Sequence, residues 1–146
     1  MSKDNISKST IMFTDIVGYS AMVNKDQEHA MELLSMHDKI IEPIIKQNGG
    51  EIIKKIGDSF FVEFQTPESS IITAQNAQIE LAKRNEVSNQ KDKVEIRIGL
   101  HNGDVIRKDD DLFGHDVNLC SRIESLAPVG GIAASAELIE PLSSKE

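Results

Sequence analysis

Several residue types are scarce in this sequence, and each scarcity excludes a class of protein. Cys120 is the only cysteine, so no disulfide can form within the chain, and the reducing cytoplasm is the expected location. No apolar run approaches the roughly 20 residues of a membrane helix. The N-terminal stretch MSKDNISKST lacks the apolar segment of a secretory signal. Membrane-spanning, secreted and disulfide-rich proteins are therefore excluded.

Basic residues are also fewer than acidic ones. The chain carries 24 acidic and 16 basic residues, a net charge of −8, which argues against a nucleic-acid partner held by general electrostatics. A nucleotide remains compatible, because it needs only a local site. With 4 prolines and 39% hydrophobic residues among 146, the chain is too apolar for disorder. Its length fits one domain, residues 1–146, with a single core.

Hydrophobic periodicity predicts the first half of the fold. Residues 10–13 form a short β-prone run, and apolar residues at three- and four-residue steps predict a helix over 25–47. Pro43 interrupts that run, so it either kinks the helix or begins a second one after Glu42. Two β-rich segments, Glu51–Ile56 and Ser59–Phe64, flank Gly57-Asp58 and predict a hairpin.

Hydrophobic periodicity also predicts the elements of the second half of the chain. A helix is predicted over 67–85, then a strand over 94–100 that continues to Ile106, a helix over 117–126, a short strand over Ile132–Ala134 and a helix over 136–142. The order β-α-β-β-α-β-α-β-α predicts an α+β fold, a ferredoxin-like or palm-like, mostly antiparallel sheet with helices packed on it. The expected core positions of the two longer helices are Ile71, Ile72, Ala74, Leu81 and Ala82, then Val117, Cys120, Ile123 and Leu126.

Two aspartates stand at positions suited to a metal. Asp15 follows the first predicted strand, and Asp58 lies in the predicted hairpin turn. Carboxylates at adjacent strand ends can converge on hard divalent cations, which prefer oxygen ligands. Each aspartate also has an ordinary explanation, since Asp15 is a suitable helix cap and Asp58 a suitable turn former.

Four segments together resemble the class III nucleotidyl cyclase catalytic domain, the family of adenylate and guanylate cyclases. They are IMFTDIVGYSAM, GGEIIKKIGDSFFVEF, IRIGLHNGDV and DLFGHDVNLCSRIES. They occur in the family's order, and the resemblance covers residues 8–142. It implies the cyclase fold and the bacterial adenylate cyclase type, an enzyme of signal transduction that converts ATP to cyclic AMP and pyrophosphate.

The resemblance also implies a cofactor and a phosphate site. In the family, two Mg²⁺ or Mn²⁺ ions are held by residues that match Asp15, Asp58 and the backbone carbonyl of Ile16. Free N–H groups where a loop meets a helix can cradle phosphate oxygens. The family's loop that holds the β- and γ-phosphates matches Gly18, Tyr19 and Ser20.

Lys54 and Asp111 match the family's base-reading pair. An ammonium can only donate and adenine N1 accepts, while a carboxylate accepts from the exocyclic amine of adenine. Guanylate cyclases carry glutamate where Lys54 stands, so the pair implies ATP. The alternatives are a solvated lysine like Lys55, and an acidic loop over 109–111.

Asn118 and Arg122 lie four residues apart on a predicted helix and therefore share a face. In the family, the matching asparagine orients the ribose and the matching arginine stabilises the charged transition state, which suits a permanent, forked cation. Taken alone, the pair would be an exposed feature of an amphipathic helix. Cys120 lies among apolar positions and is expected to be a core residue.

The family's domains pair head to tail, which implies a homodimer with each site shared between chains. One chain would supply Asp15 and Asp58, and the other Lys54, Asp111, Asn118 and Arg122. Family members usually continue beyond the last predicted helix, so the chain is either a trimmed catalytic domain or a natural protein without that piece.

Three other functions remain open. A guanylate cyclase is disfavoured by Lys54 and Asp111, and a diguanylate cyclase by IGDSF in place of GGDEF. The third is a non-enzymatic nucleotide-binding or dimerising regulatory module.

Overall fold

A single sheet organises the chain. The computed structural model describes residues 5–143. Its sheet has the strand order β2-β3-β1-β4-β5, with β6 pairing β4 as well. All pairings are antiparallel except that of β6 with β4, so the predicted mostly antiparallel sheet is confirmed. The strands are β1 (Ile6–Ile16), β2 (Glu51–Ile56), β3 (Ser59–Phe64), β4 (Ile96–Lys108), β5 (Asp111–Phe113) and β6 (Ile132–Ala134).

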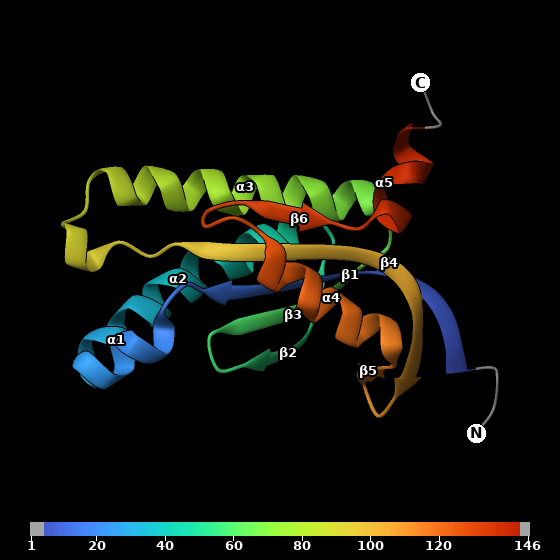
Figure 1. Cartoon of the computed structure of the whole chain (residues 1–146), viewed down its shortest axis with the longest axis horizontal. Helices are drawn as coiled ribbons and strands as arrows, with labels where there is room; N and C mark the ends of the chain where they lie inside the picture. Colours follow the sequence, from blue (N-terminus) through green and yellow to red (C-terminus); the bar gives the residue numbers. More distant parts are fainter. Residues whose placement is uncertain (1–4, 144–146) are drawn as a thin grey trace.

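Helices cover both faces of the sheet. In Figure 1, helix α3 (Pro67–Glu86) lies above β4, and helix α4 (His115–Leu126) crosses in front of β4 and extends below it. Apart from one 3₁₀ turn at Gln90–Asp92, the described helices are α1 (Tyr19–Lys25), α2 (Gln27–Gln47), α3 (Pro67–Glu86), α4 (His115–Leu126) and α5 (Ala136–Ser143). No helix among residues 5–143 is both long and apolar enough to cross a membrane.

The sheet separates two hydrophobic clusters. The larger one packs Met12, Phe60 and Leu100 against α2, α3 and α5. The smaller one packs Phe13 and Phe61 against Val117 and Cys120 of α4. Because neighbouring strand residues point to opposite faces, Phe60 and Phe61 enter different clusters. The same alternation sends each polar residue of these strands to one defined face.

Helix α4 packs unusually close to β4, because two glycines of the strand leave room for it. A Cβ on Gly99 would lie 2.4 Å from the backbone nitrogen of Glu124, and a Cβ on Gly103 would lie 2.5 Å from the Asp116 carboxyl carbon. Real side chains do not approach so closely. These glycines therefore fix the depth at which α4 lies on the sheet.

The tertiary structure shows whether Pro43 interrupts α2 and where α2 begins. Pro43 does not begin a new helix, because α2 runs unbroken over Gln27–Gln47. The packing of buried Ile41 and Ile45 on either side of Pro43 offsets the one backbone hydrogen bond that proline removes. The break falls at Asp26, whose extended backbone and side-chain hydrogen bond to the His29 nitrogen (3.1 Å) cap α2.

Three expected core positions are wrong. Ile72 is 47% exposed and Leu126 is 80% exposed, and Ala82 is exposed as well. The buried stripe of α3 lies one position away from Ile72, and that of α4 includes a glutamate. The stripes are Ser70, Thr73, Ala74, Ala77 and Leu81 in α3, and Val117, Cys120 and Glu124 in α4.

Candidate functional site

Asp15 and Asp58 lie close together, as their positions in the sequence predict. Oδ2 of Asp58 accepts a hydrogen bond from the backbone nitrogen of Ile16 at 2.7 Å, which ties the hairpin turn to the end of β1. Oδ1 of Asp15 is buried and has no hydrogen-bond partner. The pKa of Asp15 is raised, chiefly by burial and further by the charge of Asp58, while its side-chain interaction with Glu124 acts in the opposite direction. The end of β1 therefore holds two carboxyl groups that repel each other.

Glu124 is a third carboxyl beside Asp15, which the sequence analysis did not select. It is only 6% exposed, and its Oε2 atom has no hydrogen-bond partner. Burial, followed by the charge of Asp15, raises the pKa of Glu124 to about 8. Its spacing from Val117 and Cys120 places it on the buried stripe of α4, and a charged residue at a core-facing position is the signal that could have found it.

This arrangement fits a divalent cation at Asp15 and Asp58. A buried carboxylate oxygen without a partner is unfavourable unless a cation or a proton satisfies it, and the mutual repulsion of the aspartates favours a cation further. Carboxylate oxygens are the ligands that Mg²⁺ and Mn²⁺ prefer. Within residues 5–143, no three His, Cys, Asp or Glu side chains converge on a complete metal site. A metal ion at Asp15 and Asp58 would therefore need further ligands.

The loop after β1 leads directly from the aspartates into α1. Gly18 precedes this helix in the left-handed conformation, with φ of 71°, which glycine adopts readily. Tyr19 is half-buried and Ser20 is exposed. Burial, and after it the charges of Asp58 and Asp38, raises the pKa of Tyr19. The predicted phosphate loop thus lies beside Asp58.

Lys54 and Asp111 form an ion pair between β2 and β5. Nζ of Lys54 is 2.9 Å from Oδ2 of Asp111, and this hydrogen bond is the main reason that the pKa of Asp111 is lowered. The same Nζ lies 6.0 Å from the ring centre of Phe61 and 5.9 Å from that of Phe113.

Lys54 and Asp111 differ in their surroundings from the like-charged residues next to them. Lys55 points to the opposite face, where its Nζ lies 3.2 Å from Asp38, so it differs from Lys54 in its surroundings. Asp109 and Asp110 form the exposed turn, both with positive φ. Asp111 instead begins β5 and pairs with Lys108 of β4. It is therefore distinct from the acidic tip.

Asn118 and Arg122 lie on α4, outside the strands and the turn that carry the other charged site residues. Both are exposed on α4. In the described part of the chain, neither side chain has a hydrogen-bond or ion-pair partner, although the backbone nitrogen of Asn118 bonds to Gly114 at 3.3 Å. Cys120, on the buried side of the same helix, is fully buried, and burial raises the pKa of its thiol to about 12. The expectation that it is a core residue is confirmed.

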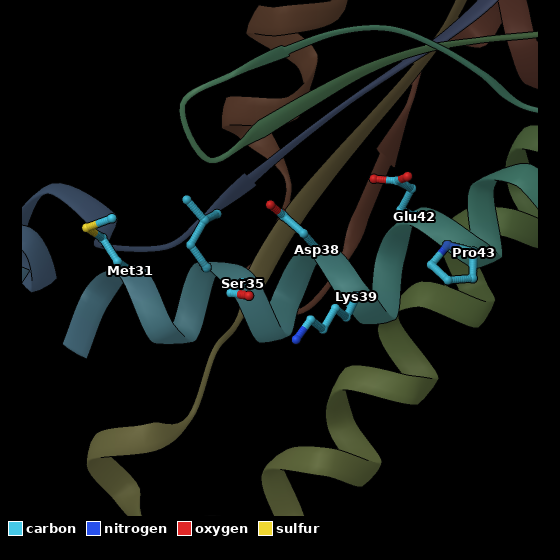
Figure 2. A pocket seen from close by; sticks show the side chains of 7 residues that line it. Met31, Ser35, Asp38, Lys39, Glu42 and Pro43 are labelled. Carbon is cyan, nitrogen blue, oxygen red and sulfur yellow. The ribbon is translucent and has the colours of Figure 1, made fainter. Parts of the chain in front are cut away.

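A groove of about 510 Å³ lies elsewhere, along the outer surface of α2. Figure 2 shows that its labelled side chains all project from this one helix, with Asp38 and Glu42 on the side of the β2–β3 hairpin. None of the predicted site residues lines it. The candidate site residues lie instead at the end of β1 and in the loop after it, in the β2–β3 hairpin, at the start of β5 and on α4.

Comparison with known proteins defines the class to which this chain belongs. A sequence model described as the adenylate and guanylate cyclase catalytic domain matches residues 1–146. The crystal structure of an adenylate/guanylate cyclase/hydrolase from Silicibacter pomeroyi superposes with a TM-score of 0.87 at 27% identity, covering 97% of this chain and 83% of that one.

Two curated relatives illustrate the range of names in this family. A Rhizobium meliloti protein whose name places it among the adenylate cyclases is 33% identical over 138 residues, which are 92% of this chain and 24% of that protein. A receptor-type guanylate cyclase of Caenorhabditis elegans is 28% identical over 151 residues, covering 92% of this chain and 15% of that protein. This chain belongs to the class III adenylate and guanylate cyclase catalytic domain family, and it spans about a quarter or less of the length of these relatives.

Proposed function

We propose that this chain is an adenylate cyclase catalytic domain, which converts ATP to 3′,5′-cyclic AMP and pyrophosphate. The ribose 3′-oxygen attacks the α-phosphorus in line, the bond from that phosphorus to the oxygen bridging the β-phosphorus breaks, and pyrophosphate leaves. The 3′-hydroxyl proton passes to solvent. The observation that carries the choice of ATP is the Lys54–Asp111 pair at 2.9 Å.

This pair presents a donor beside an acceptor, and the edge of adenine offers the complement. Lys54 donates to N1, and Asp111 accepts from the neighbouring exocyclic amine. Guanine carries an acceptor and a donor at adjacent positions in the reverse order, O6 and then N1–H. It therefore fits the pair only when the base is turned or shifted along its edge, so ATP and GTP have to be compared directly.

Asp15, Asp58 and the Ile16 carbonyl would hold the metal ions. Support comes from the unpartnered Oδ1 atom of Asp15 and from the repulsion between the two carboxyls. Two divalent ions held there would offset phosphate charge and make the attacking oxygen a better nucleophile. The loop of Gly18, Tyr19 and Ser20 would hold the β- and γ-phosphates next to Asp58.

Asn118 and Arg122 would orient the ribose and stabilise the charge that develops on the α-phosphate. Both side chains are exposed and lack partners within residues 5–143, which suits residues that complete a site on a second chain. We therefore propose a homodimer with two shared sites, related by two-fold symmetry. A cytoplasmic location and a single domain over 1–146 stay predictions from the sequence.

The test is a direct product assay. The purified chain is incubated with Mn²⁺ and either ATP or GTP, and cyclic nucleotide and pyrophosphate are both measured. We expect equal amounts of cyclic AMP and pyrophosphate, with kcat/KM for ATP at least about tenfold above that for GTP, because a wrong base leaves polar groups unpaired. A preference for GTP would contradict the base assignment alone. Nucleotide binding without either cyclic product would favour the regulatory module and contradict the proposal.

A further inference from the structure

The contact between β4 and α4 contains a buried histidine. His101 lies between Gly99 and Gly103 on β4, and since side chains alternate along a strand, all three positions face α4. The two glycines bring the helix backbone against the strand. His101 is 1% exposed and therefore fills the space between them.

Both ring nitrogens of His101 are hydrogen-bonded. Nε2 is 2.8 Å from Oδ1 of Asp116 in the first turn of α4, and Nδ1 is 2.7 Å from the hydroxyl of Ser135, between β6 and α5. The pKa of Asp116 is lowered, chiefly by its hydrogen bond to His101. Because an ionised carboxylate only accepts, Nε2 of His101 carries a proton and donates to Asp116.

The other carboxylate oxygen of Asp116 is also engaged. Oδ2 accepts from the backbone nitrogen of Asp104 at 2.9 Å. The Asp116 carboxylate thus attaches the first turn of α4 to β4 by two hydrogen bonds, one with the His101 side chain and one with the Asp104 backbone. Through His101 the same turn is linked to Ser135 at the start of α5. Asn118 follows Asp116 by two positions, and Arg122 lies one further turn along the same helix.

The connectivity of Ser135, His101 and Asp116 is that of a hydrolase triad, but the setting is not. Ser135 is 9% exposed, and its own backbone supports α5, since its carbonyl accepts from the nitrogens of Leu138 and Ile139 at 3.1 and 3.2 Å. A nucleophile has to reach a substrate. The arrangement therefore suits a structural link.

We propose that His101 is a positioning residue for the cyclase reaction, which holds α4 at the depth and rotation that place Asn118 and Arg122 against the ribose and the α-phosphate. This inference rests on the proposed function. A displacement of about 1 Å at a reacting group lowers rates by about 100-fold, so a small movement of α4 is enough to be measured. The base-reading residues lie on β2 and β5, outside this link.

The test compares three variants with the wild-type chain at saturating Mn²⁺. His101→Leu removes both side-chain bonds at similar volume, and Ser135→Ala removes only one. Thr10→Val is the matched control, because it removes the 3.0 Å bond from Thr10 to Asn102, which joins β1 and β4 on the opposite face. We expect His101→Leu to lower kcat about 10- to 100-fold with KM for ATP changed less than about threefold. Ser135→Ala should lower kcat several-fold, and Thr10→Val less than twofold.

A second readout does not depend on activity. Amide hydrogen exchange over residues 115–122 should be at least about tenfold faster in His101→Leu than in Thr10→Val. Equal exchange rates over residues 115–122 in His101→Leu and Thr10→Val would overturn the inference. So would an equal loss of kcat in these two variants when they lose the same thermal stability. If His101→Leu fails to fold, Ser135→Ala decides by the same two measurements. If the wild-type chain forms no cyclic nucleotide, the proposed function fails, and the exchange rates still decide whether His101 positions α4.

Discussion

Lys54 and Asp111 are 57 positions apart in the sequence, yet their charged groups lie 2.9 Å apart on one face of the sheet. The next residue, Lys55, points to the other face and lies 3.2 Å from Asp38. Two adjacent lysines of the same strand therefore have different surroundings. Each is a control for the other.

We expect Lys54→Met to lower kcat/KM for ATP by about 100-fold or more, because the base loses its donor and Asp111 loses its partner. Lys55→Met removes the same charge from the opposite face and should change kcat/KM less than about threefold. Steady-state kinetics with ATP measure both. Equal losses in the two variants would show that Lys54 has no particular role at the base.

Replacing the positive charge of Lys54 with a negative one should change the preference between adenine and guanine. Lys54→Glu combined with Asp111→Ser replaces the donor with an acceptor and removes the facing carboxylate. We expect ATP use to fall and some GTP use to appear, since guanine N1 is a donor. The ratio of kcat/KM values for the two nucleotides is the measurement, and an unchanged ratio would contradict the predicted orientation of Lys54 toward the base.

Asp15→Ala and Asp58→Ala should both abolish Mn²⁺-dependent turnover but differ in stability. Asp58 accepts the 2.7 Å bond from Ile16, and its loss should lower the free energy of unfolding by about 1 kcal/mol. Asp15 has a buried oxygen without a partner, so its removal should leave stability unchanged or raise it. Urea denaturation in metal-free buffer separates the two. Near wild-type turnover in either variant would remove that residue from the metal site.

Shared sites can be tested by complementation. Asp15→Ala and Arg122→Ala should each be inactive alone, because each damages every site of its own homodimer. After subunit exchange, half of the dimers are mixed and keep one intact site, so activity should return to about a quarter of wild type. A demonstrated exchange of subunits without recovery would place the whole site within one chain.

Glu124 should make stability depend on pH. Its pKa is about 8 in the folded chain, against an ordinary value of 4.5. Between those values the unfolded chain loses the proton that the folded chain keeps, so rising pH lowers the free energy of unfolding, by at most about 1.4 kcal/mol per pH unit. Glu124→Gln removes this effect and should gain stability relative to wild type from pH 5 to 8.

Two measurements check this prediction. Urea denaturation at several pH values gives the difference between Glu124→Gln and wild type, which should grow with pH and level off above 8. In the Asp15→Ala background the difference should be smaller, because Asp15 is the second cause of the raised pKa and burial remains. A pH-independent difference would mean that Glu124 is ionised in the folded chain.

Much of the fold follows from local patterns. The hairpin over Glu51–Ile56 and Ser59–Phe64 has the bounds that its residues predict, because strand alternation and turn chemistry act over a few neighbouring residues. The motifs around Asp15, Asp58 and Arg122 likewise identified the family. They named the pairs Asp15–Asp58 and Lys54–Asp111, whose members the structure places together.

What the sequence could not determine depends on contacts between distant segments. Local periodicity did not show which face of α3 would be buried, nor that α2 would run through Pro43, because packing against the sheet decides both. Glu124 became a buried neighbour of Asp15 only when Gly99 let α4 approach β4. The energies of burial and of charge interaction depend on distances in space, and the folded chain alone sets those distances.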